Sequence, residues 1–212
     1  MLIQPPRPAI ARCTFYPGDL VLFAGHNWES RAIALATCSP AQLLLGQWFS
    51  HVAICADYRG RVLLFESTTL CDLPCEIRRC KVHGPQAHDP RLRVHSYAGS
   101  VWRMRLSRDK RLCDDERQSL TASLTGKLGE GYDYEGAAIC GTRLLRLARW
   151  IRPSLDRLFC SRYCMSALKA IDVVDHDLNP AVYSPARMAR DLQWWGTYQW
   201  LAAAGSESLR IK

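Results

Sequence analysis

The segment Ser50–Ser67, SHVAICADYRGRVLLFES, is the part of the sequence that decides the predicted fold. Val52–Ala56 is a short apolar run typical of a buried strand, and Val62–Glu66 is a second run of the same kind. Tyr58-Arg59-Gly60 between them carries turn residues. The sequence therefore predicts two antiparallel strands joined as a β-hairpin.

His51 begins the first of these strands and Glu66 ends the second. Because the chain reverses between them, we expect both side chains near the same end of the sheet. A carboxylate beside an imidazole fixes its tautomer and stabilises the imidazolium, so the pair is a candidate general base with its orienting acid. The alternative is a structural histidine and a glutamate that meets water at the strand end.

A second informative segment is Leu158–Cys164, LFCSRYC, which begins a helix expected over Phe159–Ile171. Cys160 lies at the start of that helix, where free N–H groups and the helix dipole favour a thiolate and can stabilise an oxyanion. The same residue shares an apolar stripe with Cys164. Cys160 is therefore either a nucleophile or a core thiol.

The remaining pattern mixes helices and short strands without regular alternation, which predicts an α+β fold with a small antiparallel sheet packed against helices. Further strands are expected over Leu20–Phe23, Val101–Leu106 and Gln193–Leu201, and further helices over Glu29–Thr37, Asp114–Leu128, Ile139–Ile151 and Ser184–Leu192.

Length and composition fit one globular domain. The chain has 212 residues, 48% of them hydrophobic and 23% charged. We expect the domain over residues 16–204, an extended arm over 1–15 and a polar tail over 205–212. The net charge of +8 favours acidic partners, such as cell-wall polymers or anionic lipid. The basic residues form no recognisable nucleic-acid module, and no apolar run is long enough for a transmembrane segment.

Ten cysteines are present, three of them in a segment over about 71–99 that is predicted to be an irregular, Cys-rich insertion. The spacing of Cys71, Cys75 and Cys80 does not match a standard zinc site, so we expect free thiols there and no metal or other cofactor. No signal peptide is recognisable, because prolines interrupt the first residues. We therefore expect the chain to be made in the cytoplasm, with its thiols reduced.

Several short motifs occur in the order expected of one enzyme superfamily. They are Gly18-Asp19-Leu20-Val21, Ser50-His51-Val52, Phe65-Glu66-Ser67, Gly131-Tyr132-Asp133-Tyr134, Phe159-Cys160-Ser161 and the segment from Ser184-Pro185 to Leu192. Together they resemble the circularly permuted papain-like cysteine amidases and peptidases of the NlpC-like group, which are related to lecithin–retinol acyltransferase-like proteins. The resemblance covers roughly residues 16–70 and 100–195.

This resemblance implies a permuted papain-like fold with the nucleophile at a helix N-terminus. It implies that Cys160 is the nucleophile, His51 its base and Glu66 the residue that orients the base. The residues expected to line the substrate cleft are Asp133, Tyr134, Ser161 and Arg162. Many members of the group have an acidic residue where this chain has Arg162.

The function implied is hydrolysis of an amide bond, with peptidoglycan peptides as the first choice of substrate. Two alternatives stay open: a structural tail or baseplate protein that retains the fold, and an acyl-lipid hydrolase or acyltransferase. A wall hydrolase without a signal peptide would be delivered by a larger assembly, such as a phage tail or a secretion machine.

Overall fold

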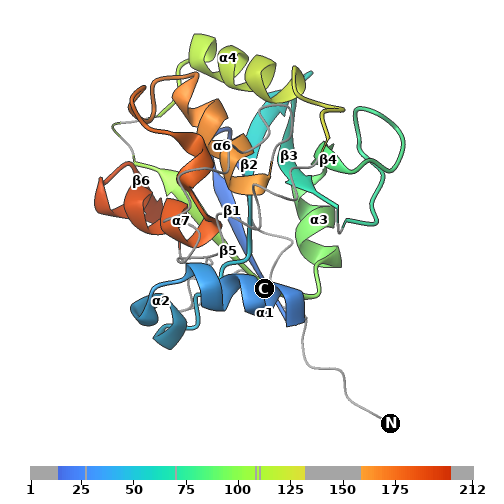
Figure 1. Cartoon of the computed structure of the whole chain (residues 1–212). Helices are drawn as coiled ribbons and strands as arrows, with labels where there is room; N and C mark the ends of the chain where they lie inside the picture. Colours follow the sequence, from blue (N-terminus) through green and yellow to red (C-terminus); the bar gives the residue numbers. More distant parts are fainter. Residues whose placement is uncertain are drawn as a thin grey trace, which may run out of the picture.

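The computed structural model describes residues 14–201, apart from residues 27, 70, 108, 110 and 132–158. Its centre is a six-stranded antiparallel sheet with the strand order β4-β3-β2-β1-β5-β6 (Figure 1). The strands are β1 Leu20–Gly25, β2 His51–Tyr58, β3 Arg61–Thr68, β4 Gly84–His88, β5 Gly99–Leu106 and β6 Tyr198–Trp200. The α+β class predicted from the sequence is confirmed.

The helices surround this sheet. They are α1 Trp28–Thr37, α2 Pro40–Leu44, α3 Pro90–Ser96, α4 Asp114–Thr125, α6 Cys160–Lys169, the 3₁₀ helix η4 Pro180–Val182 and α7 Pro185–Trp194. Helices α4, α6 and α7 supply buried residues to the core on one face of the sheet (Figure 1). In the described part of the chain, no helix combines the length and hydrophobicity needed to cross a membrane.

Continuous apolar strands arise here because both faces of the sheet are covered. Along β1, Leu20 and Leu22 pack into the core beneath the helices. Val21 and Phe23 point to the opposite face and join a smaller cluster with Val94 of α3. The two-residue period of a strand therefore does not appear as an alternation of apolar and polar residues.

The predicted hairpin is confirmed, with β2 and β3 paired through Ile54↔Phe65 and Tyr58↔Arg61. The two turn residues between the strands, Arg59 and Gly60, have φ values of 51° and 77°. Positive φ at both central positions is the conformation whose twist matches two paired strands. The turn thus fixes the register in which the start of β2 lies beside the end of β3.

The segment expected to be irregular contains two regular elements. Strand β4 pairs with β3 through Glu66↔Gln86, and helix α3 follows it, capped by the side chain of Asp89. The prediction of an irregular segment is therefore wrong for residues 84–96. Its cause is Pro85, which lowers the strand signal but is tolerated because β4 is an edge strand.

Other boundaries moved only slightly. The expected last strand is shorter, because α7 continues to Trp194 and β6 begins at Tyr198. The predicted helix over Ile139–Ile151 lies outside the described residues, as do residues 1–13 of the arm and the tail over 205–212.

Candidate active site

Three predicted residues from separate elements meet at one end of the sheet. His51 is the first residue of β2, Glu66 lies near the end of β3, and Cys160 is the first residue of α6. The Nε2 atom of His51 lies 2.6 Å from Oε2 of Glu66. His51 also forms a hydrogen bond with Cys160. The hairpin thus supplies the imidazole and the carboxylate, and the packing of α6 onto β2 and β3 adds the thiol.

Glu66 is completely buried and is held by Arg93 of α3. Arg93 donates from Nε to Oε1 at 2.5 Å and from Nη2 to Oε2 at 3.0 Å. Burial alone would raise the pKa of Glu66, but the charges of Arg93 and His51 outweigh it and the pKa falls below its usual range. The carboxylate therefore stays ionised beside His51.

The charge on His51 follows from its two neighbours. Burial lowers the pKa of an imidazole, but the Cys160 thiolate and the Glu66 carboxylate together raise the pKa of His51 to about 9. Because Glu66 contacts Nε2, the nitrogen left for Cys160 is Nδ1. The raised pKa keeps the His51 member of the His51–Cys160 pair protonated near neutral pH.

The N-terminus of α6 lies directly at this pair. Phe159 is the N-cap residue, and its side chain makes no capping hydrogen bond. The first N–H groups of a helix have no partner inside the helix, so such an end can stabilise negative charge on a bound carbonyl oxygen. This position is the one that an oxyanion site beside Cys160 requires.

A cleft of about 470 Å³ gives access to the pair, and both Cys160 and His51 line it. Ile33 of α1 lines one wall, and Tyr97, which follows α3, lines another. The Tyr97 side chain hydrogen-bonds Ser50, next to His51. Cys160 itself is 6% exposed, and this cleft gives a substrate a route to the sulfur.

Two of the other predicted cleft residues, Ser161 and Arg162, are not among the described residues that line it. Ser161 is fully buried, and its hydroxyl donates to the carbonyl of Tyr183, so it anchors α6 to the segment after η4. Arg162 is half-buried and is not among the residues that line the cleft. The sequence expectation is corrected for Ser161, because its position in the first helical turn directs the hydroxyl to Tyr183 and not into the cleft. Asp133 and Tyr134 lie outside the described residues.

Arg93 and His88 belong to the site but were missed in the sequence. His88 is buried, with Nε2 3.0 Å from Oε1 of Gln86 and 3.6 Å from Oε1 of Glu66. Both missed residues lie in the segment predicted to be irregular, and Arg93 is one of 28 basic residues. The sequence feature that could have revealed Arg93 is Asp89-Pro90, which is typical of a helix start. A helix beginning there would hold Arg93 in its first turns.

Among the described residues, one cluster of three acidic, cysteine or histidine side chains is close enough together to hold a metal ion. Glu66, Cys71 and His88 have donor atoms within 4.8 Å of one another. Cys75 is instead buried in the core and Cys80 is exposed, so neither joins this group. Because Arg93 already binds both oxygens of Glu66, a cation there would have to displace a guanidinium.

Comparison with known proteins gives little beyond this geometry. No protein-family model matches the chain, and no curated protein matches it. The chain is similar to a crystal structure of the metalloprotein yiiX from Escherichia coli O157:H7. The two are 18% identical, with a TM-score of 0.46, over 85% of this chain and 82% of the other.

Proposed function

We propose that this protein is a thiol-dependent hydrolase that cleaves an amide bond, with Cys160 as nucleophile and His51 as general base. The observation that carries the proposal is the line of contacts from Arg93 through Glu66 and His51 to Cys160, which ends in an accessible cleft. The order histidine, glutamate, cysteine along the chain agrees with the resemblance to circularly permuted papain-like amidases.

The reaction follows from the groups present. The Cys160 sulfur attacks the amide carbonyl carbon, and N–H groups at the start of α6 stabilise the oxyanion. His51 gives its proton to the leaving amine as the C–N bond breaks, which leaves a thioester on Cys160. Water then attacks the thioester while His51 takes its proton. The acid product leaves, and Glu66 holds the ring throughout.

For the substrate, we propose a peptidoglycan peptide. The net charge of +8 favours an acidic polymer, and the amidases that the sequence resembles act on cell-wall peptides. Delivery by a larger particle, such as a virion or a secretion machine, belongs to the same proposal.

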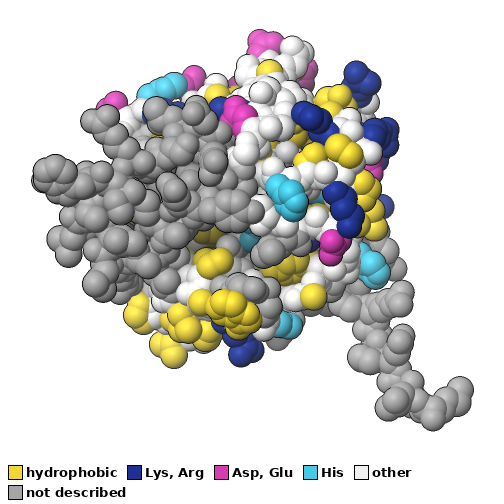
Figure 2. Space-filling model, turned by 45° about the vertical axis from the view of Figure 1, so that its right-hand side comes forward, with side chains coloured by type: hydrophobic (Ala, Val, Ile, Leu, Met, Phe, Trp, Pro, Cys, Tyr) yellow, Lys and Arg dark blue, Asp and Glu magenta, His cyan; other side chains and the backbone are white. Residues whose placement is uncertain are grey.

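An acyl ester lipid is the second candidate, and one feature favours it. Ile33 lines the cleft and is itself 42% exposed, and Trp28 and Leu35 on the same helix are 76% and 59% exposed. Hydrophobic side chains gather in the lower part of the face shown in Figure 2, around α1 and α2. A hydrophobic rim at the cleft would suit an acyl chain.

The test compares purified wild type with Cys160→Ala, and with Cys113→Ala as a matched control at an exposed thiol. Muropeptides and an acyl ester lipid are offered separately, and products are read by mass spectrometry. New amine and acid termini from muropeptides, lost in Cys160→Ala and kept in Cys113→Ala, support the proposal. Turnover of the ester alone supports the second candidate. Turnover of neither favours a tail or baseplate protein that retains the fold.

A further inference from the structure

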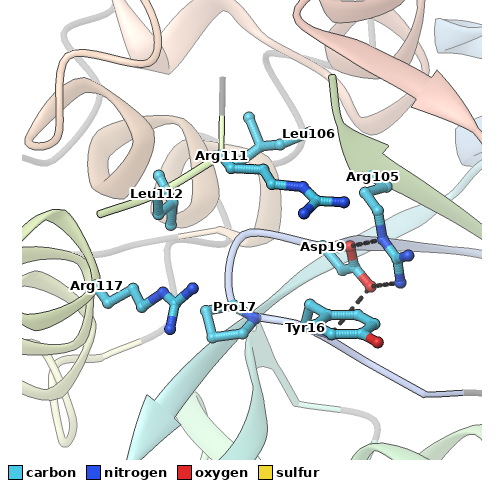
Figure 3. Close-up of a pocket in the computed structure, with 8 residues that line it drawn as sticks. All are labelled: Tyr16, Pro17, Asp19, Arg105, Leu106, Arg111, Leu112 and Arg117. Atoms are coloured by element: carbon cyan, nitrogen blue, oxygen red, sulfur yellow. Dashed lines mark hydrogen bonds and ion pairs between the residues drawn. The ribbon is translucent and has the colours of Figure 1, made fainter. Parts of the chain in front are cut away.

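A second cavity lies at the opposite end of β1 from the cleft. Gly25, at the end of β1, lines the cleft with Cys160, whereas Asp19, just before the start of β1, lines the second cavity. Its volume is about 240 Å³. The walls come from the turn before β1, the end of β5, the connection to α4 and the first turn of α4 (Figure 3).

One carboxylate in this cavity, that of Asp19, is already engaged by arginines. Asp19 is buried, and Arg105 binds it with Nε 3.0 Å from Oδ1 and Nη2 3.2 Å from Oδ2. The ring of Tyr16 lies 4.3 Å from the Arg105 guanidinium, and the Tyr16 N–H also donates to Oδ2. Arg103 also approaches this carboxylate, with Nη1 3.8 Å from Oδ2, so Asp19 is shared by two guanidinium groups and the geometry of Arg105 is fixed.

Two further arginines have no such match. Arg111 makes no hydrogen bond or ion pair with any part of the chain that the structure describes, and Figure 3 shows its guanidinium directed towards the Asp19–Arg105 pair. Arg117 approaches from α4 and has only a 3.7 Å contact with Asp114, whose side chain is 91% exposed. Two positive charges therefore face the same small cavity, and the buried carboxylate among its described lining residues, Asp19, is already taken by Arg103 and Arg105.

We propose that this cavity binds a phosphomonoester group, carried by a small soluble molecule or by a lipid headgroup. A phosphomonoester carries about −1.5 to −2 charges at pH 7, which suits the guanidinium of Arg111 together with that of Arg117, whose described partner is the exposed Asp114. Arginine forks bind phosphate oxygens in a bidentate manner. Pro17, Leu106 and Leu112 supply apolar walls for the first carbons of the group that bears the phosphate. This inference is independent of the chemistry at Cys160.

Calorimetric titration of the full chain with glycerol 3-phosphate tests the proposal, with acetate as the singly charged comparison. We expect saturable binding of one equivalent, and binding of acetate weaker by about tenfold or more because it pairs with only one arginine. Arg111→Ala and Arg117→Ala should each weaken binding by about tenfold or more. Arg91→Ala is the matched control, since Arg91 is an exposed arginine of α3 away from this cavity.

Co-sedimentation with vesicles containing phosphatidic acid distinguishes the two sources of the phosphate. Vesicle binding that Arg111→Ala abolishes supports the lipid source, and calorimetric binding without vesicle binding supports the soluble source. The Nε–Hε NMR signals of Arg111 and Arg117 in the wild type give a readout that needs no variant, and they should shift with glycerol 3-phosphate. No saturable binding in either arm, acetate binding as tightly, or an equal loss in Arg91→Ala would overturn the proposal.

Discussion

The Nε2 atom of His51 lies 2.6 Å from Oε2 of Glu66, and this contact determines which nitrogen of the imidazole is available for chemistry. With Nε2 engaged, Nδ1 is the nitrogen left for Cys160. Glu66 cannot turn away, because Arg93 holds both of its oxygens. The orientation of the base is therefore set by a buried network that a substrate never contacts.

We expect Cys160 to react faster with iodoacetamide at pH 6 than the other described thiols. Its hydrogen bond with His51 places an acid–base group beside the sulfur, whereas burial raises the pKa of Cys38 to about 11 and raises those of Cys55 and Cys164 well above their usual range. Peptide mapping after limited labelling gives the order. His51→Ala should slow labelling at Cys160 and leave the exposed Cys113 unchanged; labelling of Cys160 last would contradict the pair.

The titration of His51 provides a second prediction. NMR of the ring should give a pKa near 9, and Cys160→Ser should lower it, because the thiolate is the largest influence that raises it. Since the folded pKa lies above the unfolded value of about 6.5, the stabilisation from charged His51 is fully present below pH 6.5 and is lost as pH rises through about 9. A pKa of His51 that is the same in both proteins would refute the coupling.

Removing Arg93 should strongly destabilise the protein. Arg93→Ala leaves the Glu66 carboxylate buried without its main partner, which costs about 3–5 kcal/mol of unfolding free energy at pH 7. Urea denaturation measures this loss. Arg91→Ala on the same helix is the control and should change stability by less than about 0.5 kcal/mol, because Arg91 is exposed.

The pH dependence of the Arg93→Ala effect follows from Glu66. The folded pKa of Glu66 is lowered in the wild type, so its stabilisation is present above the unfolded pKa and is lost as pH falls. The difference between wild type and Arg93→Ala should therefore shrink in acid. A difference that stays constant from pH 7 into acid would mean that Arg93 acts through packing alone.

Protein purified without added metal should contain less than one equivalent of zinc or iron. Cys75 is buried in the core and Cys80 is exposed, so the three loop cysteines do not form a joint ligand set with Cys71. The charge of Arg93 also opposes a cation at Glu66. Elemental analysis decides this, and one equivalent of zinc that is lost in both Cys71→Ala and His88→Ala would show that a metal replaces the Arg93 contact.

His51, Glu66 and Cys160 could be named as candidates because each has a recognisable local position, and the resemblance to permuted papain-like amidases favoured Cys160 as a nucleophile over a core thiol. His51 and Glu66 lie at the two ends of a hairpin whose turn residues are adjacent in the chain. Cys160 begins a helix that the neighbouring pattern predicts. In contrast, Ser161 was assigned to the cleft although its side chain points to Tyr183, because a direction within the first helical turn depends on what the helix packs against.

By itself, the sequence determined the α+β class and the hairpin, because strand and helix patterns and turn residues act over a few neighbouring positions, and its resemblance to permuted papain-like amidases made His51, Glu66 and Cys160 the candidate site. Only the tertiary structure decided that β4 extends the sheet and that Arg93, 27 residues after Glu66, binds its carboxylate. Contacts of this kind are chosen by burial: once Glu66 is removed from water, its charge requires a partner, and the fold determines which arginine is within reach.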